Sequence, residues 1–340
     1  MANGDEPSEE AGGAAGAASV SGMPGIAIGA PPVLRLSYRG IGWDLFGVLI
    51  VNTFLTLVTL GIYAPWARTR RRKYVWRHVE IENQVLDYTG TGKELFLGYL
   101  KVAAVYLLLF VVPQVVVARI SRPAGLVMQA IAGVVLMVVV PFAIYWSRRY
   151  LLSRTRWRGI RFGLGGEAKP FAKQFIGGTL LTVVTLGLYG PVFANRIYGT
   201  LMRNTRYGNK NFRYDGPDRE AFFIGLKGFL LTIVTLGIYF CWYRANVSRF
   251  RMSHTHIDGA TVRFGATGGL LFKLTLINVF ANAFTLGIAF PWTFSYTLRE
   301  ILGQITVEGP IDFARITQLE VAGDAVGDSL ASSLGVELGV

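Results

Sequence analysis

Four apolar segments of the sequence carry polar side chains at a spacing that places them on one face of a helix. Each segment contains the string Thr-Leu-Gly, and the polar positions lie seven and three residues before its threonine and at the threonine itself. This polar stripe comprises Asn52, Thr56, Thr59, Thr182, Thr185, Thr232, Thr235, Asn278, Asn282 and Thr285, with Gly178 and Gly228 at two of the first positions. Hydroxyl and amide groups in an apolar helix either hold neighbouring helices together or line a polar path. The sequence leaves both interpretations of the stripe open.

A second candidate site is a run of basic residues that follows the first apolar segment. It consists of Arg68, Arg70, Arg71, Arg72 and Lys73. A basic side chain close to a negatively charged membrane surface contributes about 1 kcal/mol of attraction. The run therefore predicts contact with anionic lipid headgroups. The alternative is that these charges only fix the orientation of the neighbouring helix, because basic residues favour the cytoplasmic side.

Residues that soluble enzymes use are sparse in this chain. His254 and His256 are predicted to share one face of a strand, but no cysteine is close to them in sequence, so metal binding is not favoured. The string at 89–94 lacks the first glycine of a phosphate-binding loop, and no Ser or Thr follows Lys93. The single cysteine, Cys241, excludes an internal disulfide. We expect no catalytic residue, no cofactor and no metal, and an intramembrane enzyme is the least favoured class.

The elements that must position these residues are strongly apolar. Six windows approach or exceed the roughly 20 residues that a membrane-spanning helix needs, and each contains at most one charged residue. They are 43–65, 95–118, 124–147, 171–193, 221–243 and 269–294. The whole chain is 52% hydrophobic and only 16% charged, with a mean hydropathy of +0.41. These values predict an integral membrane protein, mainly helical, whose partners are membrane lipids.

The net charge of +13 does not point to a nucleic-acid partner. The basic residues gather at the ends of the apolar windows, whereas a nucleic-acid surface interleaves basic and aromatic residues along one face. We therefore expect no nucleic-acid binding.

Internal similarity divides the chain into units. The strings TLGIYAPW (59–66), TLGLYGPV (185–192), TLGIYFCW (235–242) and TLGIAFPW (285–292) are copies of one pattern. Short segments in which apolar and polar residues alternate open each unit, and a further one lies at 311–316, which is typical of strands. The tryptophans Trp66, Trp242 and Trp292 are expected to anchor the helix ends at the membrane interface.

The predicted fold is a polytopic helical bundle of about five imperfect strand-helix-break-helix repeats, with short β-hairpins on the cytoplasmic side. The units span about 33–84, 85–158, 159–210, 211–259 and 260–315. The flanking stretches 1–32 and 316–340 are rich in small and acidic residues and contain no basic residue, so we expect disordered tails there.

The strings LDYTGTGKELFLGYLK (86–101) and FRYDGPDREAFFIGLKG (212–228), with the TLGIYxPW pattern, resemble the bacterial YjgN family of inner-membrane proteins, a domain of unknown function. The resemblance covers about 33–315. It implies a multi-pass protein of the bacterial cytoplasmic (inner) membrane and brings no activity or catalytic residue. Val192 and Cys241 depart from the Pro-Trp that ends the pattern.

Basic residues follow nearly every apolar window, and simple alternation of six spans would place some of them on the periplasmic side. We therefore predict that most basic linkers are cytoplasmic. In this hypothesis the second unit forms two full spans, and the other apolar helices are re-entrant or strongly tilted and break at Thr-Leu-Gly.

Two functions are compatible with this arrangement. The first is a transporter-like or channel-like protein for a small solute or lipid. The second is a structural scaffold whose basic cytoplasmic face binds lipid or a partner. A continuous polar cavity along the stripe favours the first function, and a stripe occluded between packed helices favours the second.

Overall fold

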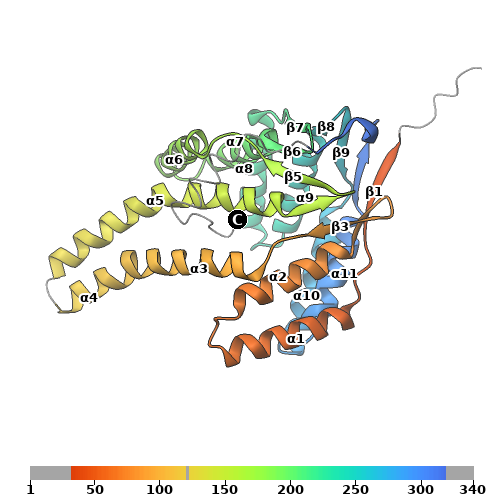
Figure 1. Ribbon diagram of the computed structural model, residues 1–340. Helices are drawn as coiled ribbons and strands as arrows, with labels where there is room; N and C mark the ends of the chain where they lie inside the picture. The colour runs from red at the N-terminus through yellow and green to blue at the C-terminus, as the bar shows by residue number, and fades with distance from the viewer. Residues whose placement is uncertain (1–31, 120–121, 319–340) are drawn as a thin grey trace, which may run out of the picture. The chain divides into compact units, whose positions relative to one another are not determined.

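The strands of the chain close into a ring. The computed structural model describes residues 32–119 and 122–318 (Figure 1). Every neighbouring pair of strands is antiparallel, and the order around the ring is β1-β10-β9-β8-β7-β6-β5-β4-β3-β2. The strands are β1 (Val33–Tyr38), β2 (Val79–Ile81), β3 (Gln84–Tyr88), β4 (Thr155–Trp157), β5 (Ile160–Leu164), β6 (Thr205–Tyr207), β7 (Lys210–Tyr214), β8 (Thr255–Ile257), β9 (Ala260–Phe264) and β10 (Ile305–Glu308). The ring is closed by pairing of β1 with β10, in which Leu34 lies opposite Val307.

Helical hairpins connect alternate pairs of strands, so that the order strand, helix, helix, strand occurs five times between β1 and β10. Four hairpins are α1 (Gly42–Val58) with α2 (Ala64–Arg77), α6 (Ala168–Val184) with α7 (Gly190–Asn204), α8 (Asp218–Val234) with α9 (Phe240–Ser253), and α10 (Gly268–Phe284) with α11 (Phe290–Leu302). The second hairpin is longer. It runs through α3 (Gly92–Tyr106), the π-helical turn η1 (Leu107–Val111) and α4 (Val112–Arg119) and returns along α5 (Arg122–Ser153).

The Thr-Leu-Gly string makes the turn between the two helices of each short hairpin. In the first hairpin, α1 ends before Thr59, and Leu60 and Gly61 adopt positive φ angles of 49° and 90°. The N–H of Gly61 donates to the carbonyl of Thr56 at 2.7 Å, which satisfies a carbonyl at the helix end. Glycine is required here because a side chain disfavours φ near 90°. The helix thus breaks where the sequence predicts, and the chain turns back on itself.

The six apolar windows do not correspond to six membrane-spanning helices. Among the described residues, one helical segment, Pro123–Ser153, is long and apolar enough to cross a membrane. Two further apolar helices, α1 and α10, have only 17 residues each. Four of the six windows run through a hairpin turn into the next helix. Hydropathy alone joined two antiparallel helices into one span, because the turn residues are themselves apolar. A polytopic bundle is therefore not confirmed, although helices dominate the chain.

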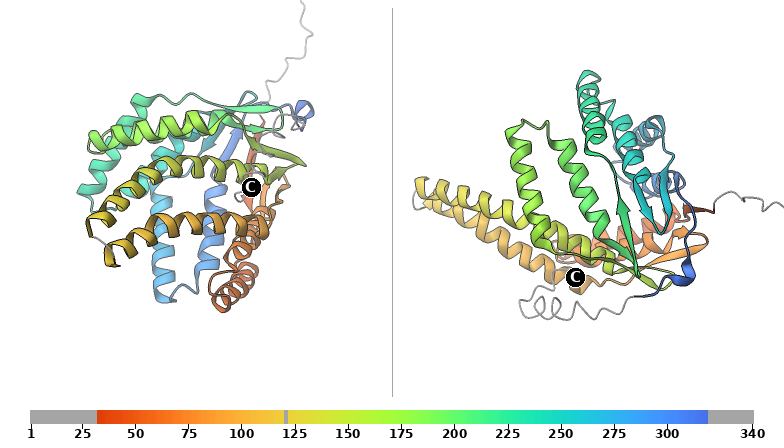
Figure 2. Two further views of the ribbon diagram at one scale, coloured as in Figure 1. Left: turned by 60° about the vertical axis from the view of Figure 1, so that its left-hand side comes forward. Right: turned by 90° about the horizontal axis from the view of Figure 1, so that it is seen from above.

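The hairpins are neighbours in the same closed order as the strands. The second helix of each hairpin packs against the first helix of the next, as α2 does against α3, and α11 packs against α1 (Figure 2). Three tryptophans, Trp66, Trp242 and Trp292, lie at these junctions against the first glycine of the next hairpin. These glycines are Gly92, Gly268 and Gly42, and a Cβ at any of them would clash with the facing tryptophan.

One face of the strands forms an apolar core. Trp157, Tyr207 and Ile257, from different strands, converge with Ile316 of the C-terminal segment, and Phe313 packs against them. Because side chains from around the ring meet this one segment, the apolar face is the inner one. Tyr207 donates to the carbonyl of Trp157 at 2.9 Å, and burial raises the pKa of Tyr207 to about 12.

The C-terminal segment differs from its prediction in two respects. Residues 311–316 are not a strand, because Asp312 caps a 3₁₀ turn, η2 (Phe313–Arg315), by accepting from the N–H of Ala314 at 3.2 Å. Ile316, placed at the start of the predicted tail, is buried in the core of the ring. The rest of the two predicted tails, 1–31 and 319–340, lies outside the described residues.

Candidate functional site

The amide members of the polar stripe face the second helix of their own hairpin. Asn52 is buried on α1, and its Nδ2 donates across the hairpin to the carbonyl of Ala67 at 3.3 Å. On α10, Asn278 donates to Thr297 Oγ1 at 2.7 Å, and Asn282 donates to Thr293 Oγ1 at 3.2 Å. These contacts hold the two helices of a hairpin together. The side-chain carbonyl oxygens of Asn52 and Asn282 have no hydrogen-bond partner within the described parts of the chain.

The hydroxyl members of the stripe form hydrogen bonds with the backbone of their own helix and of the turn. Thr56, Thr182 and Thr232 each donate to a carbonyl one turn earlier, at 2.6–2.7 Å. The threonines of Thr-Leu-Gly do the same, and each also accepts from the backbone N–H four residues later. These four bonds are Tyr63 N to Thr59, Tyr189 N to Thr185, Tyr239 N to Thr235 and Ala289 N to Thr285, at 2.9–3.0 Å. The stripe therefore fixes the hairpin turns.

The two glycines of the stripe leave space for aromatic rings of the facing helix. A Cβ at Gly178 would clash with the ring of Phe193, and one at Gly228 would clash with Tyr243. Each ring comes from the returning helix of the same hairpin, so the absence of a side chain allows the two helices to approach closely. The stripe hydroxyls of these two hairpins are only partly buried, and Thr232 lines a cavity between α7 and the α8–α9 hairpin.

The basic run lies on α2, with its members in different surroundings. Arg68, Arg70 and Arg71 are exposed, whereas Arg72 and Lys73 are partly buried. The Arg68 guanidinium lies 5.0 Å from the ring centre of Tyr99 on the next hairpin, and Arg70 lies 5.6 Å from that of Tyr63.

Arg72 instead donates to the hydroxyl of Tyr88 at 3.3 Å, at the end of β3. In the part of the chain that the structure describes, none of the five basic residues has an ion pair with a carboxylate. The exposed members of the run are therefore available to an anionic partner.

The hairpin turns expose large apolar side chains. The leucines of Thr-Leu-Gly are almost completely exposed, with Leu60 at 94%, Leu186 at 95%, Leu236 at 95% and Leu286 at 93%. The preceding residues, such as Val184 and Phe284, are also exposed. Apolar surface of this extent is unfavourable in water and marks contact with a membrane or another protein.

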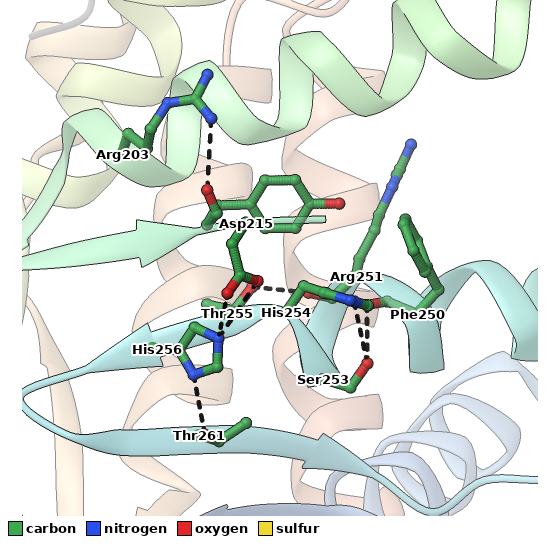
Figure 3. Close-up of polar contacts among 10 residues, drawn as sticks. Arg203, Asp215, Phe250, Arg251, Ser253, His254, Thr255, His256 and Thr261 are labelled. Carbon is green, nitrogen blue, oxygen red and sulfur yellow. Dashed lines mark hydrogen bonds and ion pairs between the residues drawn. The ribbon is translucent and has the colours of Figure 1, made fainter. Parts of the chain in front are cut away.

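The two histidines do not form a site with each other (Figure 3). His254 is the C-cap residue that follows α9, and its Nδ1 lies 2.8 Å from the carbonyl oxygen of Phe250. Only His256 lies on a strand, so the prediction of a shared strand face is wrong, because α9 continues up to Ser253. His256 instead contacts Thr261 through Nδ1 at 2.9 Å and Asp215 through Nε2 at 3.4 Å. The described residues contain no group of His, Cys, Asp and Glu that could hold a metal ion.

One polar contact between hairpins is not apparent from the sequence motifs. Asn195 on α7 is buried, accepts from the hydroxyl of Tyr214 and donates to Asp218 Oδ1 at 2.9 Å. Burial raises the pKa of Tyr214 above its usual value. The sequence does contain a sign of this contact, since buried polar residues recur ten positions after the Thr-Leu-Gly threonine. They are Thr69, Asn195 and Ser295.

Comparison with known families identifies the chain. A family model described as a bacterial protein of unknown function, DUF898, matches residues 33–230 and 210–278, which is more than half of the sequence. The chain belongs to this family. The similarity to YjgN-like proteins, seen first in the repeated motifs, is thereby confirmed.

Curated relatives of this DUF898 chain carry the name inner membrane protein YjgN. The protein from Salmonella typhimurium is 30% identical over 128 residues, which cover 38% of this chain and 30% of the relative. The one from Escherichia coli K12 is 28% identical over 134 residues, covering 39% and 32%. The matched region thus spans about a third of the length of these relatives. No solved structure matches the chain.

Proposed function

We propose that this DUF898 protein is a scaffold of the bacterial inner membrane. Its helical hairpins enter the bilayer from the cytoplasmic side, and its basic residues bind anionic lipid headgroups. The observation that carries the proposal is the exposure of the hairpin turns, where Leu60, Leu186, Leu236 and Leu286 present apolar side chains at the point farthest along the chain from the strands. The names of the relatives support an inner-membrane location.

The connectivity supports entry from one side. Both ends of every hairpin join strands of the same ring, so a hairpin that enters the membrane also leaves it on the ring side. A helix of 17 residues is about 25 Å long, shorter than the roughly 30 Å hydrocarbon core. The short hairpins therefore dip into the bilayer without crossing it. The 32 residues of α5 extend about 48 Å, enough for a full crossing in the second hairpin.

The scaffold function has more support than transport of a small solute. A transporter needs polar groups that face a solute, whereas the stripe's amides and hydroxyls mostly bond within their own hairpins. The feature that a transport function would use is the pair of unpartnered carbonyl oxygens on Asn52 and Asn282. The third candidate, an intramembrane enzyme, lacks support, because the described residues contain no group of His, Cys, Asp and Glu that could hold a metal ion.

The lipid-binding part of the proposal is tested by the preference of the protein for anionic lipid. The full chain is reconstituted in mixtures of phosphatidylglycerol and phosphatidylcholine, and brominated forms of each lipid in turn quench its tryptophans. The wild type should prefer phosphatidylglycerol. In the triple variant R68Q/R70Q/R71Q, each lost charge should reduce that preference by up to about fivefold, equivalent to about 1 kcal/mol. R213Q, which removes an exposed arginine of strand β7, is the matched control. An unchanged preference in the triple variant would refute headgroup binding by this run.

A further inference from the structure

Two cavities adjoin each other along helix α9. One, of about 450 Å³, lies where strands β1, β9 and β10 come near the end of α9, and Arg35 and Arg263 line it. The other, of about 340 Å³, lies between α8 and α9, and Lys227 lines it. Arg249 and Ser253 line both cavities. Together they form one groove, here called the α9 groove.

Cations outnumber carboxylates in the α9 groove. The cations are Arg35, Lys227, Arg249 and Arg263, and the carboxylates are Glu220 and Glu308. Glu308 forms an ion pair with Arg263, in which Oε2 lies 3.5 Å from Nε. Arg249 gives one N–H to the carbonyl of Ala266 at 3.0 Å, which fixes the side chain and leaves its other donors available. Within the described residues, neither Arg35 nor Arg249 has a carboxylate partner. This donor set suits a phosphate group.

A separate apolar cavity lies nearer the hairpin turn. It has a volume of about 410 Å³ and lies between α7 and the α8–α9 hairpin, with Leu188, Phe229 and Phe240 in its lining. Tyr243 lines both this cavity and the groove. Arg249 and Tyr243 are six residues apart on α9, about 9 Å along the helix axis. A cationic cavity and an apolar one therefore lie close together.

We propose that the α9 groove and the apolar cavity bind one anionic phospholipid, with its phosphate at Arg249 and an acyl chain beside Phe229 and Phe240. A water-soluble phosphate compound would use the cations but leave the apolar cavity empty. The polar end of the site lies at the strands and the apolar end near the turn of the hairpin, which is the orientation of a lipid in a membrane that the hairpin enters from the ring side. The inference rests on the proposed function for this orientation, but it concerns residues outside the basic run of α2.

The test uses the full chain purified in detergent, with phosphatidylglycerol as the probe and phosphatidylcholine as the comparison lipid. Native mass spectrometry measures the lipid that the protein retains. R249Q should weaken retention of phosphatidylglycerol by about tenfold or more, because one charge-assisted contact contributes at least that factor. R249K, which keeps the charge, should retain an intermediate amount. A194F fills the apolar cavity from its exposed wall and should also lower retention, whereas the control R213Q should not.

A second measurement separates lipid from soluble phosphate. Glycerol 3-phosphate is titrated calorimetrically into the wild type and into R249Q, and no binding is expected at millimolar concentrations. Arg249-dependent binding of glycerol 3-phosphate together with unchanged retention of lipid in A194F would overturn the proposal. Wild-type retention of phosphatidylglycerol in R249Q would overturn it as well. If R249Q behaves like the wild type while R68Q/R70Q/R71Q loses its lipid preference, the groove proposal fails and the proposed function stands.

Discussion

Trp242 on α9 lies against the backbone of Gly268, the first residue of α10. A Cβ on Gly268 would be 2.7 Å from the α-carbon of Trp242 and closer still to its indole ring. The same contact joins Trp66 to Gly92 and Trp292 to Gly42. These tryptophans were expected to be interfacial anchors, and the structure places them at the junctions between successive hairpins.

Replacing Gly268 by alanine should destabilise the protein. The added methyl group has no space beside Trp242, and overpacking of this kind costs about 1–3 kcal/mol. The matched control is Gly47→Ala in the middle of α1, where nothing lies within 4 Å of the added atom. This control should gain about 0.5–1 kcal/mol, because alanine favours a helix more than glycine does. Thermal unfolding in detergent measures both changes, and equal unfolding temperatures for the two variants would contradict the packing described.

The contact between Asn195 and Tyr214 should show energetic coupling. Asn195→Leu leaves the buried tyrosine hydroxyl without its acceptor, at a cost of about 1–3 kcal/mol. Tyr214→Phe removes that hydroxyl, so the double variant should be more stable than the sum of the two single losses indicates. Urea unfolding of the four proteins measures the coupling. Strict additivity would mean that this hydrogen bond does not join the hairpins.

Asp258 should make stability depend on pH in the acidic range. Lys210 Nζ lies 2.5 Å from one carboxylate oxygen, and the N–H of Asp312 donates to the other at 3.3 Å. The hydrogen bond from Lys210 holds the pKa of Asp258 below its usual value. The ionised carboxylate therefore adds stability above the unfolded pKa of about 3.9, and this stability is lost as the pH falls through the lower folded pKa.

The variant Asp258→Asn isolates this effect, because asparagine tolerates the positive φ of 47° at this position. At pH 7 it should unfold about 2–4 °C below the wild type, the shift expected for a partly exposed ion pair of about 1 kcal/mol. The difference should persist at pH 5 and shrink below pH 4. A difference that is the same at pH 3 and pH 7 would exclude the ionised carboxylate as its source.

The hairpin turns should lie in hydrocarbon. In a Cys241→Ala background, a cysteine at Leu236 carries an environment-sensitive dye, and a second variant carries it at Asn83 in the turn between β2 and β3. Reconstituted in vesicles, the dye at position 236 should emit at shorter wavelength and be quenched by lipids brominated on their acyl chains. The dye at position 83 should show neither effect. Emission typical of water at position 236 would show that the turn is outside the bilayer.

The local elements of this fold could be predicted from the sequence to a large extent. Alternating residues marked the strands that open each unit, and Thr-Leu-Gly marked the helix breaks, because Gly61 and its counterparts must adopt a positive φ. The closed ring could not be predicted in this way. Its closure depends on Leu34 pairing with Val307, and such long-range pairing leaves no local pattern. Hydropathy alone does not define the number of spans, because the turn residues are as apolar as the helices.

The candidate sites also differ in whether a local sequence pattern reveals them. The polar stripe and the basic run are local patterns that can be found in the sequence. The structure is needed only to show which residues they contact. The α9 groove combines Arg249 and Arg263, which are near each other in the sequence, with Arg35 of β1, which only the closure of the ring brings to them. The contact between Asp215 and His256 was missed for the same reason, since the two residues are separated by 41 positions.

In the topology proposed here every hairpin enters and leaves the membrane on one side, and cysteine accessibility in intact cells measures this. Single cysteines at Asn83, Asn209 and Asp258, in the turns between successive hairpins, are treated with a membrane-impermeant maleimide before and after the inner membrane is opened. All three positions should react only after the membrane is opened, as cytoplasmic residues do. Labelling of any one of them in cells with an intact inner membrane would place that turn in the periplasm and exclude entry from one side.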